Sequence, residues 1–288
     1  MINNKIVIKK LAVIGNPISH SLSPVMHNAA LNFLGIDSEY IAVNLEKDCF
    51  KNFIAKAGKN FSGFNVTVPY KSAIIPFLDI VEDECLSSQS VNTVVIDKDG
   101  KLHGKSTDGY GLEMALNEVF HVSPTDINLF FIGCGGAAKA VAAHFLKKGV
   151  KSIVFANRTV ANAAEFTSKL KLKYPKSNIK FCSLTDHNKI NEFLDLNPIV
   201  IQSTSLGLGK EDPSPLAPEL FRRGLRVFDM IYHKTKFLSL AESKKCVCAD
   251  GRLMLLYQGA RSFYLWTGIE PPIKIMKKAL FSSLTINQ

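Results

Sequence analysis

The sequence predicts an α/β protein with two domains. Strand-like and helix-like segments alternate along the first hundred residues, which is the pattern of an α/β layer structure. A glycine-rich turn near residue 133 lies between a strand-like and a helix-like segment, as in a βαβ unit. The length of 288 residues is also typical of two domains of ordinary size. We therefore expect an N-terminal α/β domain and a second domain of the Rossmann type.

In the first half, apolar periodicity and turn residues indicate each element. Ser23 is expected to cap the first helix, with Pro24 at its first position and Gly35 at its end. Asp99 and Gly100 predict the turn of a hairpin. The expected elements are a strand at 9–15, a helix at 23–35, a strand at 38–45, a helix at 46–58, a strand at 63–68 and a hairpin within 92–104.

The second half repeats the alternation and then becomes helical. A helix is expected from about residue 109 to 121, and a helical pattern runs from about residue 252 to the end. Between them lie short apolar runs that end in polar or small residues, which is typical of parallel strands whose ends face a ligand. These runs are 127–133, 152–159, 198–205, 226–232 and 246–251.

Composition narrows the class of protein. The net charge of +10 comes from lysines spread along the chain, so we interpret it as a solvated surface, with attraction of anionic substrates as a secondary role, and expect no nucleic-acid partner. No apolar run approaches the roughly 18 residues of a membrane span, and the first residues lack a secretory signal, so we expect a cytoplasmic protein without a membrane partner. The scattered cysteines, including the pair Cys246 and Cys248, predict thiols and no metal site.

The segment "GCGGAA" at residues 133–138 fits the G-x-G-x-x-A pattern of a dinucleotide site. Gly133 permits a tight turn, Gly135 lets a pyrophosphate approach the backbone, and Ala138 allows close packing of helix on strand. Gly136 and Ala137 complete the turn, where a helix N-terminus offers free N–H groups to phosphates. The alternative is a closely packed turn without a ligand, but the strand–turn–helix context favours nucleotide binding.

The next strand-like run ends on "ANRT", so Arg158 stands where an NAD site usually has an acidic residue. A guanidinium offers a fork of donors to a 2′-phosphate, with Asn157 and Thr159 as neutral neighbours. These residues predict NADP(H) as the cofactor. The alternative is a surface arginine at the start of a helix.

Lys71 and Asp108 are the candidate catalytic pair. Lys71 follows the apolar run "NVTVPY", and Asp108 lies where the two predicted domains join. Facing each other across an interdomain cleft, they would suit ketone reduction, because the ammonium can donate a proton to the developing alkoxide while the carboxylate holds it. Taken alone, such a lysine is more often solvated and such an aspartate more often part of a turn.

Nine motifs occur in the order found in shikimate dehydrogenases, which this chain resembles over nearly its whole length. They are "IGNPISHSLSPVMHNAAL" (14–31), "FNVTVPYK" (64–71), "SVNTVV" (90–95), "STDGYG" (106–111), "GCGGAAKA" (133–140), "ANRT" (156–159), "STSLGL" (203–208), "FDMIY" (228–232) and "GRLMLLYQGARSFYLWTG" (251–268). The resemblance implies that residues 1–107 and 253–288 form a substrate-binding and catalytic domain and 108–252 an NADP-binding Rossmann domain.

The resemblance also implies an activity and a set of site residues. Family members reduce 3-dehydroshikimate to shikimate with NADPH, in the pathway to chorismate and the aromatic amino acids, and use a lysine and an aspartate matching Lys71 and Asp108. The substrate-binding positions are matched by Ser21 and Ser23 for the carboxylate, by Thr67, Asn92, Asp108 and Gln258 for the ring hydroxyls, and by Tyr232 near the carboxylate. Further cofactor positions are matched by Thr204, Met230 and Gly251.

The chain departs from the family pattern at two places. Ser106 replaces the usual asparagine of the N-T-D-G run, and "YHKTKF" after the family tyrosine lacks two prolines, which predicts a more mobile loop. His20 and His27 flank the serine motif, and we interpret them as structural. Cys134 stands where the family commonly has alanine, and we interpret it as a small residue of the turn.

Three other functions stay open. A quinate/shikimate dehydrogenase that prefers NAD has the same fold, but Arg158 argues against that cofactor. A non-catalytic NADPH-binding regulatory protein is disfavoured by the presence of both Lys71 and Asp108. A nucleic-acid-binding module is suggested by charge alone. A homodimer is compatible with the sequence.

Overall fold

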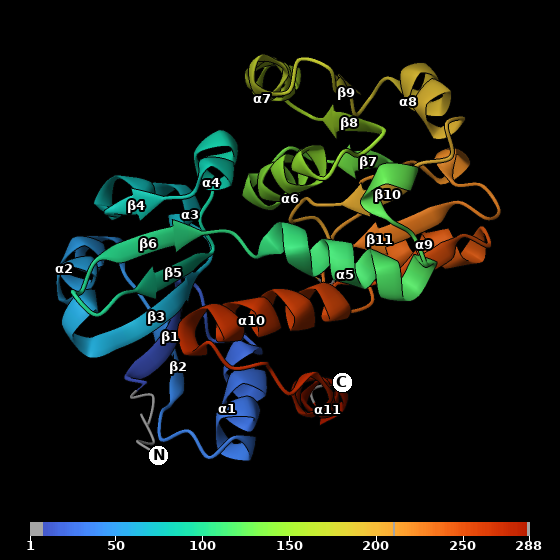
Figure 1. The fold of residues 1–288 in the computed structure, drawn as a ribbon. Coiled ribbons are helices and arrows are strands. Elements are labelled where there is room, and N and C mark those ends of the chain that lie inside the picture. Colours follow the sequence, from blue (N-terminus) through green and yellow to red (C-terminus); the bar gives the residue numbers. More distant parts are fainter. Residues whose placement is uncertain (1–7, 210, 287–288) are drawn as a thin grey trace. The chain divides into compact units, whose positions relative to one another are not determined.

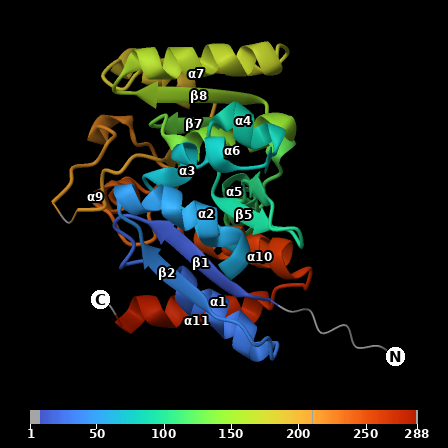
Figure 2. The same ribbon diagram turned by 90° about the vertical axis from the view of Figure 1, so that its left-hand side faces the viewer.

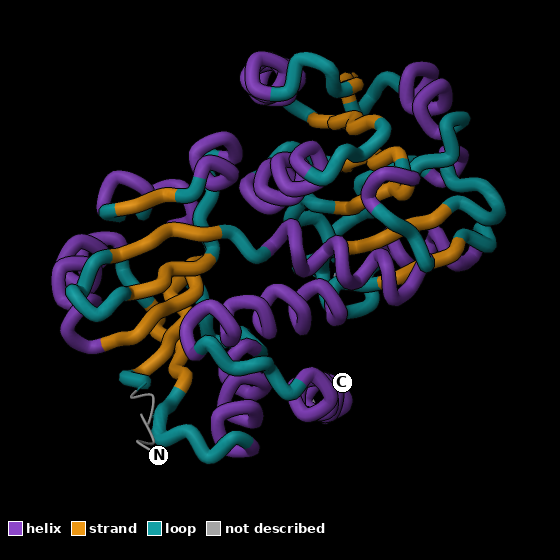
Figure 3. Tube along the Cα trace, viewed as in Figure 1, coloured by secondary structure: helices purple, strands orange, loops and turns teal. Residues whose placement is uncertain are grey.

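The computed structural model describes residues 8–209 and 211–286. The chain divides into two compact units, of which unit 1 comprises residues 1–111 and 255–288 and unit 2 comprises residues 112–254. The divisions fall inside two helices, α5 (Asp108–Phe120) and α10 (Arg252–Thr267), whereas the sequence placed them at 107/108 and 252/253. Within the described residues, each unit contains one six-stranded sheet (Figure 3).

The sheet of unit 1 is mixed. Its strand order is β2-β1-β3-β5-β6-β4, in which β1 runs parallel to both β2 and β3. Strand β5 is antiparallel to β3 and β6, and the β5–β6 turn is the predicted hairpin, with Gly100 at φ +83°. The strands are β1 (Lys10–Gly15), β2 (Tyr40–Asn44), β3 (Phe61–Val66), β4 (Ile80–Val81), β5 (Thr93–Ile96) and β6 (Leu102–Lys105).

Helices cover both faces of this sheet. The amphipathic α2 buries Phe50, Ile54 and Ala57 in a core with Phe64 of β3. Helix α11 packs along α1 (Figures 1 and 2). The helical segments are α1 (Ser23–Phe33), η1 (Lys47–Cys49), α2 (Phe50–Asn60), α3 (Tyr70–Ala73), η2 (Ile75–Phe77), α4 (Asp83–Ser88), α10 and α11 (Ile273–Ile286).

An aromatic cluster joins α1, β2 and α10. The ring of His27 stacks on Tyr40 with 4.2 Å between ring centroids, and Trp266 lies 5.5 Å from His27. The indole N–H of Trp266 donates to the Val94 carbonyl at 2.9 Å. A Cβ on Gly63 would lie 2.2 Å from the indole, so glycine is required where Trp266 crosses β3. His27 is fully buried, and no described residue hydrogen-bonds either ring nitrogen.

The prediction that Ser23 caps α1 is wrong. The helix begins at Ser23 itself, and its N-cap is Leu22, with no capping hydrogen bond from a side chain. The Ser23 N–H contacts Ser21 Oγ at 3.4 Å, and the Ser23 side chain opposes the rise that burial causes in the pKa of the Tyr40 hydroxyl. The serine side chain therefore lies beside Tyr40 of β2 and does not cap the helix.

The sheet of unit 2 is entirely parallel and has the order β12-β11-β10-β7-β8-β9. Counted along the unit from β7, this is the 3-2-1-4-5-6 order of the Rossmann fold, so the order reverses between β7 and β10. The strands are β7 (Asn128–Ile132), β8 (Ser152–Asn157), β9 (Asn178–Ser183), β10 (Ile199–Gln202), β11 (Arg226–Asp229) and β12 (Val247–Ala249).

Alternate side chains of the unit 2 strands fill two cores, one on each face of the sheet. Phe131 packs with α5, α6 and α7, while its neighbour Phe130 packs with α8 and α9. Both faces are covered, which explains why these strands are apolar runs rather than alternating ones. The helical segments are α5, η3 (Pro124–Asp126), α6 (Gly136–Lys147), α7 (Val160–Lys173), α8 (His187–Leu194), η4 (Pro218–Leu220) and α9 (Lys236–Ser243).

Among the described residues, no helix has the length and apolar character needed to cross a bilayer.

Candidate active site

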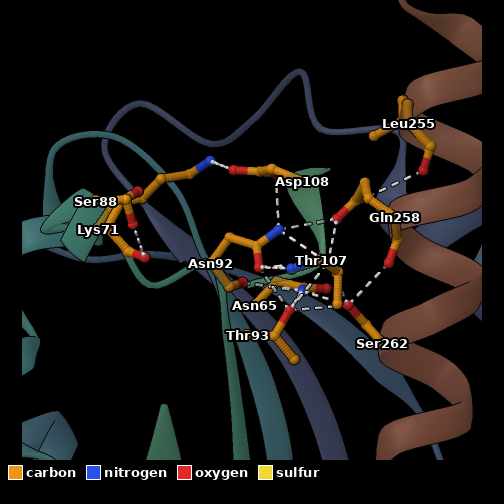
Figure 4. A network of polar contacts seen from close by, with 11 residues as sticks. Asn65, Lys71, Ser88, Asn92, Thr93, Thr107, Asp108, Leu255, Gln258 and Ser262 are labelled. Atoms are coloured by element: carbon orange, nitrogen blue, oxygen red, sulfur yellow. Dashed lines mark hydrogen bonds and ion pairs between the residues drawn. The ribbon is translucent and has the colours of Figure 1, made fainter. Parts of the chain in front are cut away.

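Lys71 and Asp108 meet in unit 1. Lys71 lies on the short helix α3, which follows β3, and Asp108 is the first residue of α5. Lys71 Nζ donates to Asp108 Oδ2 at 2.6 Å (Figure 4). The Asp108 side chain is 8% exposed and that of Lys71 19%, so the carboxylate is enclosed while the ammonium stays within reach of a ligand.

Asn92 holds the second oxygen of the carboxylate. Its amide nitrogen donates to Asp108 Oδ1 at 2.7 Å and lies 3.4 Å from Gln258 Oε1 (Figure 4). The Asn92 side-chain oxygen in turn accepts the Thr107 backbone N–H at 2.8 Å. With a donor on each oxygen, Asp108 is held as a carboxylate acceptor in one orientation.

Behind Asn92 lies a row of buried polar side chains that the sequence reasoning did not identify. Asn65 Nδ2 donates to the Asn92 carbonyl and to Ser262 Oγ, each at 3.0 Å. The Tyr40 hydroxyl donates to Asn65 Oδ1 at 2.7 Å. The row comprises Tyr40, Asn65, Thr93, Thr107 and Ser262. Its only signal in the sequence was polar residues within otherwise apolar elements.

The other predicted substrate residues of unit 1 lie around this network. Gln258 of α10 contacts both Asn92 and Thr107, each at 3.4 Å. Ser23 lies beside Tyr40, whose hydroxyl belongs to the network, and the Ser23 N–H contacts Ser21 Oγ. Thr67 follows β3 and is half-buried beside the end of β1, where a Cβ on Gly15 would lie 2.5 Å from its methyl group.

Unit 2 carries the glycine turn at the carboxyl end of β7. Gly133 has φ +100°, and its N–H donates to the Ala156 carbonyl at 2.8 Å. Gly135 is the N-cap of α6, and a Cβ there would meet no atom within 4 Å. Gly136 is exposed, Ala137 is half-buried and Ala138 is buried. The first turn of α6 is therefore an open cradle with helix N–H groups that can bind phosphate.

Asn157, Arg158 and Thr159 follow β8, at the edge where α7 begins. Asn157 Nδ2 donates to the Thr159 carbonyl at 2.8 Å, which closes the turn. Arg158 is exposed, and no described residue forms an ion pair with it. The guanidinium is available to an anion.

The remaining predicted residues of unit 2 lie on three turns that follow β10, β11 and β12. The Thr204 N–H donates to Gln202 Oε1 at 2.7 Å, and the Met230 N–H donates to the Gln202 carbonyl at 3.0 Å. Gly251 N–H donates to the Ile231 carbonyl at 3.0 Å. Tyr232 is half-buried, and burial raises the pKa of its hydroxyl.

Family models match three parts of the chain. The shikimate dehydrogenase substrate binding domain matches residues 13–94, and the shikimate/quinate 5-dehydrogenase model matches 115–208. The shikimate 5′-dehydrogenase C-terminal domain matches 251–281.

Relatives of known name match nearly the whole chain. Shikimate dehydrogenase (NADP(+)) of Pyrococcus furiosus is 37% identical over 278 residues, covering 96% of each chain. The crystal structure of the Listeria monocytogenes shikimate 5-dehydrogenase with shikimate and NAD has a TM-score of 0.85 at 34% identity, covering 95% of this chain and 96% of that one. The Thermus thermophilus enzyme with NADP(H) and shikimate has a TM-score of 0.83 at 31% identity, covering 96% and 100%.

A Rossmann-type nucleotide unit together with a unit that carries a lysine–aspartate pair defines a nicotinamide-dependent dehydrogenase. The relatives described above identify one family within this class. The chain belongs to the shikimate dehydrogenase family.

Proposed function

We propose that Lys71 and Asp108 carry out the reversible, NADPH-dependent reduction of 3-dehydroshikimate to shikimate, a step towards chorismate and the aromatic amino acids. The observation that carries this proposal is the 2.6 Å contact between Lys71 Nζ and Asp108 Oδ2, with Asn92 on the other carboxylate oxygen. The contact orients an ammonium group at a partly exposed position, as proton donation to a carbonyl oxygen requires.

Lys71 donates the proton in the direction of reduction. An ammonium group has three N–H donors, and the one on Asp108 leaves two for the carbonyl oxygen of the substrate. As that oxygen gains negative charge, its hydrogen bond to Lys71 strengthens and the proton transfers. Asp108 stabilises the ammonium form of Lys71. In the direction of oxidation, the neutral amine of Lys71 takes the proton of the substrate hydroxyl, and Asp108 holds the ammonium that forms in the same orientation. NADPH supplies the hydride when it is bound.

The substrate is proposed to bind through neutral polar groups. The hydroxyls of Ser21 and Ser23 would hold its carboxylate, and Tyr232 would complete that end. Thr67, Asn92 and Gln258 would bind the ring hydroxyls, because hydroxyl and amide groups both donate and accept. The hydrogen-bonded network behind Asn92 supports this assignment, because it leaves the amides little freedom to reorient.

The residues of unit 2 fit NADP(H). The open first turn of α6, with Gly133, Gly135, Gly136 and Ala137, would hold the pyrophosphate. Arg158, with Asn157 and Thr159 beside it, would bind the 2′-phosphate. Thr204, Met230 and Gly251 would contact the nicotinamide end. The cytoplasmic location remains a prediction of the sequence, with which a homodimer is compatible.

Steady-state oxidation of shikimate and quinate, each with NADP and with NAD, tests the substrate and the cofactor together. The proposal predicts a large preference for shikimate with NADP. Turnover of quinate with NAD as the best pair would overturn it in favour of the NAD-preferring quinate enzyme.

Variants of the same protein test the catalytic pair. Lys71→Ala should lower kcat by about 10²- to 10⁴-fold with a modest change in KM, since a general acid acts in the transition state. Lys10→Ala is the matched control, because Lys10 is exposed and has only a 3.9 Å contact with Glu39. A loss confined to KM in Lys71→Ala would show that the lysine binds substrate without transferring the proton.

A further inference from the structure

Asp229, the last residue of β11, is a fully buried carboxyl group that the proposed reaction does not use. No described residue forms an ion pair with it. A buried carboxylate without a cation is costly unless hydrogen bonds satisfy its oxygens. Its hydrogen bonds therefore indicate what the residue does.

Both oxygens of Asp229 bind the loop that follows it. Oδ1 accepts the Ile231 backbone N–H at 3.0 Å, and Oδ2 accepts the Thr235 hydroxyl at 2.7 Å. Thr235 Oγ1 also accepts the Leu238 N–H at 3.1 Å, which makes Thr235 the N-cap of α9. One carboxyl group thus ties both ends of the segment Met230–Thr235, here named the β11–α9 loop.

The turns beside this loop are packed directly against it. A Cβ on Gly207 would lie 2.8 Å from the Thr235 methyl group, and one on Gly251 would lie 2.2 Å from the Met230 carbonyl oxygen. The Gly251 N–H donates to the Ile231 carbonyl at 3.0 Å. A change in the β11–α9 loop must therefore move its neighbours or clash with them.

We propose that Asp229 is a positioning residue, which orients Met230 and Tyr232 toward the cofactor and the substrate by accepting hydrogen bonds from Ile231 and Thr235. This inference rests on the ligand-binding roles proposed above for Met230 and Tyr232.

The charge state of Asp229 supports the same role. Burial raises its pKa from 3.8 to about 6, and the charge of Asp250 adds to this rise. Three contacts oppose it, namely the hydrogen bonds from Ile231 and Thr235 and the charge of His233. A carboxylate accepts on both oxygens, but protonation turns one oxygen into a donor. Acidification through about pH 6 should therefore weaken the charge-assisted hydrogen bonds that hold the β11–α9 loop.

Titration calorimetry of NADP⁺ with the full chain tests the proposal without relying on turnover. Thr235→Val keeps the side-chain volume but removes the hydroxyl, so its Kd for NADP⁺ should rise about tenfold, the value of one hydrogen bond to a charged group. Thr235→Ser keeps the hydroxyl and should bind within about twofold of the unchanged protein. Asp195→Asn, an exposed carboxylate paired with Arg222, is the control and should bind as the unchanged protein does. Equal Kd values for all four proteins would overturn the proposal.

A pH series supplies a readout that a purely structural role would not move. If only the ionised form of Asp229 positions the loop, Kd should rise about tenfold between pH 7 and pH 5. The 2′-phosphate of NADP⁺ titrates near the same pH, so Asp229→Asn is compared, since it retains the phosphate's share of the pH dependence. An identical pH dependence in Asp229→Asn would overturn the proposal. Failure of the proposed function would appear separately, as normal NADP⁺ binding without shikimate turnover.

Discussion

His27 should make unit 1 sensitive to acid. The ring is fully buried against Tyr40, and no described residue hydrogen-bonds its nitrogens, so a charged imidazolium would have no partner. Burial lowers its pKa from 6.5 to about 3. Because the folded-state pKa lies below the unfolded value, the unfolded chain takes up the proton first. The contribution of His27 to stability is complete above about pH 6.5 and is lost as the pH falls towards 3.

The size of the effect follows from the two pKa values. Each pH unit between them removes about 1.4 kcal/mol from the free energy of unfolding, so lowering the pH from 7.5 to 5 removes about 2 kcal/mol. His27→Phe keeps an aromatic ring in the cluster but cannot titrate, and it should lack this loss. His27→Leu is a second non-titrating variant in case the larger ring does not fit.

Urea unfolding followed by tryptophan fluorescence provides the assay. Trp266 is the only tryptophan in the sequence, and its ring lies 5.5 Å from His27, so the signal reports on unit 1. Between pH 7.5 and pH 5 the unchanged protein should lose about 2 kcal/mol more than either variant. Other titrating groups affect all three proteins alike and cancel in the comparison. An equal loss in all three proteins would refute the reasoning.

Two further predictions concern the cofactor. Arg158→Ala should raise KM for NADP about ten- to hundredfold and leave KM for NAD nearly unchanged, since only NADP has the phosphate; parallel kinetics with both cofactors measure this, and an equal rise for both would contradict it. Gly251→Ala places a Cβ 2.2 Å from the Met230 carbonyl oxygen, so it should lose about 1–3 kcal/mol of stability and also bind NADP⁺ more weakly. Gly135→Ala, where a Cβ meets nothing, should unfold at the normal temperature yet bind NADP⁺ more weakly. Thermal unfolding and calorimetry separate the two effects, and normal NADP⁺ binding by Gly135→Ala would contradict the phosphate cradle.

Local patterns in the sequence predicted much of the fold. The glycine turn at residue 133, the hairpin at Gly100 and the apolar strands of unit 2 depend on backbone conformation and burial, which neighbouring residues largely specify. Strand β9 went unpredicted, because half of its side chains are exposed at the edge of the sheet and its apolar pattern is weak.

Only part of the candidate site could be predicted from the sequence. Lys71 and Asp108 could be proposed as a catalytic pair chiefly because the motifs around them resemble those of the family. Arg158 could be proposed as a phosphate ligand because it stands where an NAD site usually has an acidic residue. The 2.6 Å contact between Lys71 and Asp108 joins residues 37 positions apart, and only the tertiary structure decided it.

Tertiary structure also decided which polar groups hold the site in place. Asn65 and Ser262 are 197 positions apart and meet only because α10 crosses the sheet of unit 1. Ser23 was expected to cap its own helix, but its side chain makes no capping hydrogen bond. Asp229 was interpreted as the polar end of an apolar strand, whereas it binds Thr235 of the loop that follows. Buried polar groups such as Asn65 and Asp229 take the partners that the packed fold brings to them, because an unpaired polar group in the interior is costly. For that reason the sequence by itself determined the elements and the reactive groups, while the fold decided which side chains orient them.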